Sequence, residues 1–206
     1  LQKQTTGSKE TQLAMLKRLE LTHDVHFELV NYCRNKGVKF LSTAFDADSL
    51  NCLVNKIKLD VLKLSSGDLT NGPFLLAHAL TGKNIILSTG MANLDEIEAA
   101  LSVLAFGYIS RKTPSLEAIK NTYNSEAGQD ILRQKVTLLH CTTEYPCPMD
   151  DVNLLAMDTM AEAFGLRVGY SDHSLGITVP IAAVARGATL IEKHFTMDRT
   201  MIGPDH

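Results

Sequence analysis

Residues 168–194 read VGYSDHSLGITVPIAAVARGATLIEKH and carry the clearest strand and helix signals of the chain. Two short apolar runs, Val168–Ser171 and Thr189–His194, flank a helical pattern that begins at Thr178 and ends at Gly187. Pro180 stands in the first turn of that helix, where a missing backbone N–H costs nothing. A strand, a helix and a second strand in this order predict a right-handed crossover between two parallel strands.

The same alternation extends upstream. Four further apolar runs predict strands at Val38–Thr43, Val61–Ser65, Ile85–Thr89 and Val136–Cys141. Helical patterns lie at Glu10–Leu19, from Val25 to a stop at Gly37, after the capping pair Asn93 and Glu96, and from Leu154 to Phe164. The polar stretch 110–134 is expected to be an insertion with its own helical turns.

Two architectures fit this pattern of strands and helices. One is an open doubly wound sheet, and the other is a TIM (β/α)8 barrel, whose complete form needs eight strands. The predicted strands number about six. The chain is therefore expected to form either an open α/β sheet or an incomplete barrel with about six of eight strands present.

Composition narrows the class of protein. The chain has 206 residues, 45% of them apolar and 21% charged, with a net charge of −3, as in an ordinary globular protein. No apolar run is long enough to span a membrane, and no basic surplus points to nucleic acid, so neither is an expected partner. The four cysteines lack the paired spacing of a zinc site and predict a reduced, cytoplasmic protein.

The chain carries no internal linker or repeat, so we expect one domain over residues 1–206. It begins with Leu1 rather than Met and stops directly after Pro204-Asp205-His206. We therefore expect a piece of a longer protein.

Polar side chains follow nearly every predicted strand at its carboxyl end. They are Ser42-Thr43, Lys63 with Ser65-Ser66-Gly67-Asp68, Ser88-Thr89-Gly90, His140 with Thr142-Thr143, Ser171-Asp172-His173, and Lys193-His194. Any one of these groups could be a helix cap. Because the carboxyl ends of parallel strands form one rim, all of them together predict a binding or catalytic site.

Two histidines of that rim are candidate metal ligands. His173 and His194 follow consecutive predicted strands, with Asp172, Glu192 and Asp205 nearby in sequence. Imidazole and carboxylate donors suit manganese or a similar divalent ion. The alternative is a pair of hydrogen-bonded histidines with no metal.

Lys63 is unusual because it lies inside an apolar strand. A buried ammonium is costly unless it has a partner or a task. It could bind phosphate together with Ser66, Ser88 and Ser171, or it could be a Schiff-base nucleophile of the aldolase type. The remaining alternative is a lysine whose stem is buried while its head reaches water.

Six motifs in order resemble the sialic acid synthase family, which includes N-acetylneuraminate, legionaminate and spore-coat polysaccharide synthases. They are Lys63-Leu64-Ser65-Ser66-Gly67-Asp68, Ile86-Leu87-Ser88-Thr89-Gly90-Met91, Leu139-His140-Cys141-Thr142 with Tyr145-Pro146, Gly169-Tyr170-Ser171-Asp172-His173-Ser174, Glu192-Lys193-His194-Phe195 and Gly203-Pro204-Asp205. The resemblance spans essentially the whole chain. It implies a TIM-barrel transferase that condenses phosphoenolpyruvate with an N-acylated mannosamine-type sugar, giving a nine-carbon 2-keto acid and phosphate.

The resemblance also implies roles for individual residues. His173 and His194 would bind Mn2+ or Mg2+. Phosphoenolpyruvate would be held by a set of hydroxyls and one ammonium: Thr43, Lys63, Ser66, Ser88 and Ser171. Tyr145 and Asp205 would face the amino sugar. Asp68 or Asp205 could serve as the base that activates water, although Asp68 stands where the family commonly has the longer Glu.

Family members are usually homodimers that carry a small C-terminal antifreeze-like domain. By this resemblance residues 1–206 would be a partial synthase barrel domain, with the first two barrel strands and the antifreeze-like domain absent. Two other functions stay open on the residues alone: a Schiff-base aldolase that uses Lys63, and a barrel fragment that binds a ligand without catalysis.

Overall fold

The computed structural model describes residues 11–201. The chain divides into two compact units, one formed by Leu41–Glu192 and the other by Leu1–Phe40 with Lys193–His206. In chain order the described elements are α2 (Gln12–Leu19), α3 (His23–Asn35), α4 (Ala47–Asn51), the π-helical turn η1 (Cys52–Ile57), β1 (Val61–Leu64), the 3-10 turn η2 (Ser66–Asp68), α5 (Gly72–Leu80), β2 (Asn84–Ser88), α6 (Leu94–Ile109), α7 (Leu116–Tyr123), α8 (Glu126–Lys135), β3 (Val136–Cys141), the 3-10 turn η3 (Met149–Asp151), α9 (Leu155–Phe164), β4 (Arg167–Asp172), α10 (Thr178–Ala185) and β5 (Ile191–Lys193).

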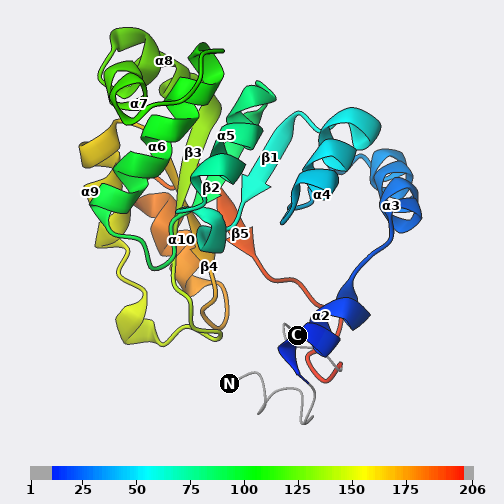
Figure 1. The fold of residues 1–206 in the computed structure, drawn as a ribbon. Coiled ribbons are helices and arrows are strands. Elements are labelled where there is room, and N and C mark those ends of the chain that lie inside the picture. The colour runs from blue at the N-terminus through cyan, green and yellow to red at the C-terminus, as the bar shows by residue number, and fades with distance from the viewer. Residues whose placement is uncertain (1–10, 202–206) are drawn as a thin grey trace. The chain divides into compact units, whose positions relative to one another are not determined.

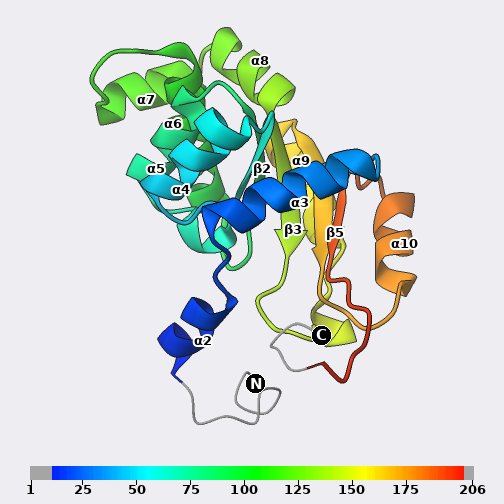
Figure 2. The same cartoon turned by 90° about the vertical axis from the view of Figure 1, so that its right-hand side faces the viewer.

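The larger unit is built on a parallel sheet (Figure 1). Its described strands lie side by side in chain order, β1-β2-β3-β4-β5, and Figure 2 shows the sheet from a second side. The pairs β1–β2, β2–β3 and β3–β4 are parallel. A doubly wound sheet would reverse its strand order at a switch point, whereas a strand order that follows the chain keeps every crossover helix on one side. The sheet is therefore part of a (β/α)8 barrel, and the open doubly wound alternative is wrong.

The first expected strand, Val38–Thr43, is wrong in extent. Thr43 alone forms an isolated parallel bridge, to Lys63 of β1. β1 is only four residues long, and the chain before it is still turning, with Lys58 in the left-handed region at a φ of 64°. β1 therefore offers few partners for a longer neighbour, and the described sheet has five strands.

The sheet has an apolar face and a polar face, because side chains alternate along each strand. Leu62 and Leu64 of β1, like Leu87 of β2, are buried on the apolar face, which α5, α6, α9 and α10 cover. Lys63 lies between Leu62 and Leu64 in β1, so its side chain is on the other face of the sheet. The register pairs Lys63 with Ile86 of β2, and Ser88 is the next residue of β2 on that same face. The polar face is the inner face of the partial barrel.

β4 and β5 approach each other closely. The backbone N–H of Tyr170 donates to the carbonyl of Leu190 at 2.9 Å. Between them lies Gly169, where an added Cβ would stand 2.4 Å from the Leu190 carbonyl oxygen. Only a glycine permits that approach.

Sequence signals for the ends of α6, α9 and α10 are confirmed, whereas α4 and α5 are not among the expected helices. Asn93 and Glu96 form a capping box at the start of α6, with both hydrogen bonds at 2.9 Å. α9 ends at Gly165 in the left-handed conformation, and α10 is followed by Gly187 with a φ of 96°. The polar stretch 110–134 forms α7 and most of α8, as expected for an insertion with its own helical turns.

In the smaller unit, threonines cap both described helices. Thr11 accepts from the Ala14 N–H at the start of α2, and Thr22 accepts from the Val25 N–H at the start of α3. Gly37 follows α3 with a φ of 69°, which confirms the predicted stop.

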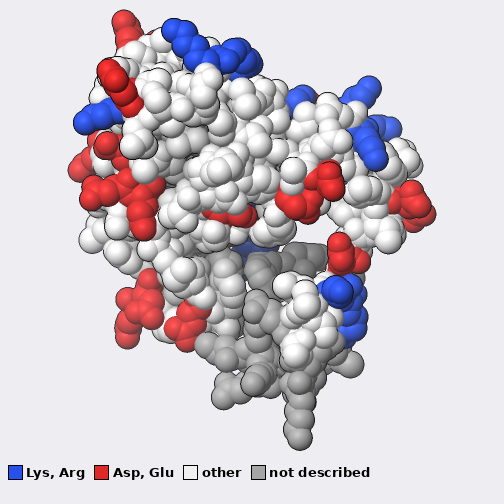
Figure 3. All heavy atoms as spheres, viewed as in Figure 1, with Lys and Arg blue, Asp and Glu red and all other residues white. Residues whose placement is uncertain are grey.

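Charged side chains are mixed on the face shown in Figure 3. Acidic groups gather where α9 and the start of α6 lie, and basic groups occur at the upper edge. Asp95 and Glu96 occupy the first turn of α6, where the helix dipole favours negative charge. No helix among the described residues is long and apolar enough to cross a membrane.

Candidate functional site

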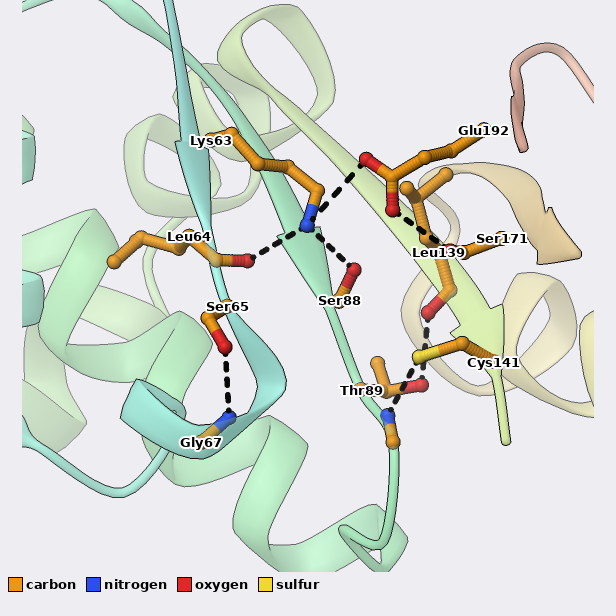
Figure 4. Close-up of polar contacts among 11 residues, drawn as sticks. Lys63, Leu64, Ser65, Gly67, Ser88, Thr89, Leu139, Cys141, Ser171 and Glu192 are labelled. Carbon is orange, nitrogen blue, oxygen red and sulfur yellow. Dashed lines mark hydrogen bonds and ion pairs between the residues drawn. The ribbon is translucent and has the colours of Figure 1, made fainter. Parts of the chain in front are cut away.

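Lys63 is the centre of a buried polar cluster on the inner face of the sheet (Figure 4). Its side chain is only 9% exposed. The ammonium donates to Ser88 Oγ at 2.8 Å and to the Leu64 carbonyl at 3.4 Å, and it lies 3.6 Å from Glu192 Oε2. The Lys63 head therefore does not reach out to water, which excludes the interpretation of a lysine with a buried stem and a solvated charge.

Glu192 links Lys63 to Ser171. The Ser171 hydroxyl donates to Glu192 Oε1 at 2.7 Å, while the other carboxylate oxygen faces Lys63. Ser171 is buried, and the Glu192 side chain is 40% exposed. β1, β2, β4 and β5 each supply one residue of this cluster (Figure 4).

The turn after β2 is fixed by three hydrogen bonds to β3. Both the backbone N–H and the hydroxyl of Thr89 donate to the Leu139 carbonyl, at 3.0 and 2.9 Å. The Gly90 N–H donates to Cys141 Sγ at 3.1 Å. Burial raises the pKa of the Cys141 thiol, against the opposing effects of the Gly90 N–H, the Lys63 charge and Ser88.

Ser66 lies directly against that turn. It begins η2, which Ser65 stabilises by accepting from the Gly67 N–H at 3.3 Å. A Cβ at Gly90 would stand 2.6 Å from both Cβ and Oγ of Ser66. Gly90 also has a φ of 48°, so the turn needs glycine for its conformation and for its closeness to Ser66.

Asp68 is the acidic residue of the turn that follows β1. It is half-buried at the end of η2, and its negative charge acts on the buried His78 of α5. Within residues 11–201 the structure records no hydrogen bond or ion pair between the Asp68 side chain and Lys63, Ser88, Ser171 or Glu192. Its assignment as a base stays a prediction.

Tyr145 and His173 lie together at the carboxyl end of the sheet. Their ring centroids are 4.0 Å apart with an angle of 46° between the ring planes. The Cys147 N–H donates to the His173 carbonyl at 2.8 Å, so the loop after β3 is joined to the loop after β4. This contact supports the predicted placement of both residues at one rim.

The predicted metal site is divided between the two units. His173 belongs to Leu41–Glu192, His194 belongs to the other unit, and Asp205 lies outside the described residues. The described ranges contain no group of three or more His, Cys, Asp or Glu side chains that could hold an ion. Asp172 accepts from the backbone N–H and the hydroxyl of Ser174, which fixes the turn after β4. The imidazole pair suits a divalent ion chemically, and its metal stays a prediction.

His140 does not belong to the cluster, although the sequence groups it with the rim. It alternates with Leu139 and Cys141 and so points to the opposite face of β3. Its Nε2 lies 2.9 Å from the Val152 carbonyl, and its ring packs against Tyr170. Burial lowers the pKa of His140.

Thus the structure brings together three of the predicted substrate-binding residues, Lys63, Ser88 and Ser171, and pairs Thr43 with Lys63 on the neighbouring chain segment. It adds Glu192 and Cys141 as members of the same inner face. The sequence could have revealed both, because side chains alternate between the two faces of a strand. Cys141 lies two residues after Leu139 in β3 and so shares its face, and Glu192 shares the inner face with Ser171 of β4. An ammonium flanked by hydroxyls is chemically able to hold an anionic group, which here is the Glu192 carboxylate.

Comparison with known proteins gives the family. The model of the NeuB family matches residues 1–206. The chain belongs to the NeuB family. It is 48% identical over 205 residues to the N,N'-diacetyllegionaminic acid synthase of Campylobacter jejuni, covering 100% of this chain and 54% of that protein. It is 41% identical over 205 residues to the enzyme of the same name from Legionella pneumophila, covering 100% and 52%.

A solved structure supports the same relationship. The N-acetylneuraminic acid (sialic acid) synthetase of Leptospira borgpetersenii, in complex with citrate, matches with a TM-score of 0.75 and 33% identity. The match covers 97% of this chain and 61% of that chain. The NeuB chain described here spans about half the length of the curated relatives that it matches.

Proposed function

We propose that this NeuB-family protein condenses phosphoenolpyruvate with an N-acylated mannosamine-type sugar and releases phosphate. The product is a nine-carbon 2-keto sugar acid of the legionaminic or sialic type. The observation that carries the proposal is the buried Lys63–Ser88 pair, with Ser171 beside it, in a chain that is 48% identical to a diacetyllegionaminic acid synthase. Such a site suits a small, strongly anionic substrate.

Phosphoenolpyruvate would be bound through its two anionic groups, the carboxylate and the phosphate. Lys63 supplies the positive charge, and Ser88 and Ser171 supply hydroxyls on the same face. Ser66, held against Gly90, would add a third hydroxyl at the rim, and Thr43 would complete the set. Tyr145 and Asp205 would contact the sugar. Fixed donors of this kind orient the substrate before reaction, which is the main contribution that a protein makes to such a condensation.

The proposed reaction forms one bond between carbons. The C3 methylene carbon of phosphoenolpyruvate attacks the aldehyde carbon of the open-chain sugar, and the aldehyde oxygen takes up a proton. Water then adds to the cationic C2 carbon and gives up a proton to Asp68 or Asp205. Cleavage of the C–O bond to the phosphoryl group then releases phosphate, which takes up the remaining hydroxyl proton, and C2 becomes the 2-keto group. His173 and His194 would hold a Mn2+ or Mg2+ ion, whose Lewis acidity would polarise the aldehyde carbonyl.

We also propose the setting of this activity. The partners are phosphoenolpyruvate and an amino sugar, with neither nucleic acid nor membrane, and the whole protein acts as a homodimer in the cytoplasm. Support comes from the family relationship.

Turnover of a small panel of sugars tests the function. The whole protein is supplied with Mn2+, phosphoenolpyruvate and, in turn, N-acetylmannosamine, its 6-phosphate and a diacetamido-trideoxy hexose. We expect phosphate release only when one of these sugars and phosphoenolpyruvate are both present, and loss of that release with a chelator.

Two results would contradict the proposal. Borohydride trapping of a carbonyl substrate on Lys63, insensitive to chelator, would establish the Schiff-base aldolase instead. Binding of phosphoenolpyruvate without turnover of any sugar would establish a ligand-binding protein.

A further inference from the structure

The Lys63 ammonium has three described partners, two by hydrogen bond and one by ion pair, and they differ in burial. Ser88 Oγ at 2.8 Å is buried, and the Leu64 carbonyl at 3.4 Å belongs to the backbone of β1 itself. Glu192 Oε2 at 3.6 Å is the longest contact and belongs to a side chain that is 40% exposed. Among the residues that the structure describes, Glu192 is thus the partner of Lys63 that can move away most readily.

Glu192 also occupies the hydroxyl of Ser171. That hydroxyl is buried and donates to Glu192 Oε1 at 2.7 Å. The two oxygens of one carboxylate therefore bridge Lys63 and Ser171, as Figure 4 shows. A carboxylate or phosphoryl group of a substrate would bridge the same two donors in the same way.

We propose that Glu192 is a built-in substitute for the substrate's anionic group, which phosphoenolpyruvate displaces from Lys63 and Ser171 when it binds. This inference rests on the proposed function for the identity of the ligand. The bound anion takes over the contacts with the ammonium and the hydroxyl, and the Glu192 carboxylate turns toward the exposed side of the site. No covalent bond changes in this step.

The arrangement has a physical reason and a cost. A buried ammonium without a counter-charge would destabilise the inner face, and Glu192 supplies that charge while keeping Lys63 and Ser171 oriented for a ligand. The same carboxylate competes with the ligand and repels it. Glu192 is therefore a positioning residue that weakens the affinity for phosphoenolpyruvate.

The variant Glu192→Gln tests this role, because it keeps an acceptor for Ser171 and removes the negative charge. Calorimetric titration of the whole protein with inorganic phosphate and with phosphoenolpyruvate measures the affinity. We expect both ligands to bind roughly three- to tenfold more tightly than to the unchanged protein, as removal of a half-exposed ion pair and of its repulsion would give. In turnover, KM for phosphoenolpyruvate falls by a similar factor, independently of kcat.

Asp60→Asn is the matched control. Asp60 pairs with Lys83 near the opposite end of β1, so this variant removes the same charge away from the site. We expect its affinity for phosphate to stay unchanged. If phosphate affinity rose equally in Asp60→Asn and Glu192→Gln, the increase would be an effect of net charge alone, and the proposal would be overturned.

Thermal unfolding shows whether Glu192→Gln is folded. If it is not, a second variant tests the same role. Glu192→Asp draws the carboxylate back from Lys63 by one methylene, and phosphate should again bind more tightly. Unchanged or weaker binding in the folded variants overturns the displacement. Because phosphate binding needs no sugar, tightening without turnover of any sugar would refute the proposed function and leave the role of Glu192 intact.

Discussion

At the scale of single residues, Lys63 shows what the sequence reveals and what it conceals. A lysine lies in the apolar run Val61–Ser65. Because burial of an unpaired ammonium costs free energy, this position alone indicates that the charge has a partner or a function. Its partner Glu192 lies far along the chain, and no sequence periodicity connects the two. The parity of each side chain follows from the sequence, but the contact also depends on the register between the strands, which only the folded sheet determines.

Loss of the Lys63 charge should abolish most of the activity. In Lys63→Met the stem is kept and the ammonium is lost, so Ser88 and Glu192 lose their cationic partner and the proposed substrate loses its counter-charge. We expect kcat/KM for phosphoenolpyruvate to fall by about hundredfold or more. Steady-state phosphate release measures it.

Lys83→Met is the control for that experiment. Lys83 pairs with the exposed Asp60, at 3.2 Å, near the end of β1 away from the cluster. Its activity should match that of the unchanged protein. A Lys63→Met variant with full activity would remove Lys63 from the site.

At the scale of elements, apolar strands and capped helices are predictable because their signals are local. The predicted strand Val136–Cys141 is confirmed residue for residue as β3, and Ile85–Thr89 differs from β2 by one residue at each end. Val38–Thr43 is wrong because its local pattern is strand-like, while pairing needs a neighbour of sufficient length. The π-helical turn η1 has no sequence signal that we could identify.

The contact between two turns gives a prediction at this scale. In Gly90→Ala the new methyl group would collide with Ser66, 2.6 Å away, and would also require a strained left-handed alanine. Because Ser66 must move, we expect KM for phosphoenolpyruvate to rise by about tenfold, since small misplacements of binding groups are costly. Steady-state kinetics at varied phosphoenolpyruvate gives the value.

Gly82→Ala separates collision from strain. Gly82 has a φ of 71°, but a Cβ there would have no atom within 4 Å. This variant should lose thermal stability and keep its KM. If both variants raise KM equally, the contact between Gly90 and Ser66 has no part in binding.

At the scale of the whole molecule, the alternation of strands and helices predicts the class of fold, and the strand order decides between the two architectures. The order β1-β2-β3-β4-β5 follows the chain, which the sequence alone cannot show. The candidate metal site is the part that stays a prediction, because His173 and His194 lie in different units and Asp205 lies outside residues 11–201.

Two buried histidines predict how stability depends on pH. Burial lowers the pKa of both His78 and His140 in the folded protein. The unfolded chain therefore binds more protons than the folded chain between these lowered values and the ordinary value near 6.5. We expect the free energy of unfolding to be highest above about pH 6.5 and to fall as the pH decreases below it. Denaturant unfolding from pH 5 to 8 measures this slope.

A pair of variants assigns the slope. His78→Asn keeps a donor for the Phe74 carbonyl, which His78 Nδ1 contacts at 2.9 Å, and removes the titrating ring, so the slope should become shallower. His23→Asn alters an exposed histidine and should leave the slope unchanged. An unchanged slope in His78→Asn would show that burial of this ring does not govern the acid sensitivity.

The close approach of β4 and β5 at Gly169 has a consequence for the cluster on the inner face. Glu192 follows Leu190 by two residues, and Ser171 follows Gly169 by two residues. A side chain at position 169 would force the two strands apart at the Leu190 carbonyl and carry Glu192 away from Ser171 and Lys63. The spacing between Lys63, Ser171 and Glu192 therefore depends on a glycine two residues away from Ser171, at a position where no side chain fits.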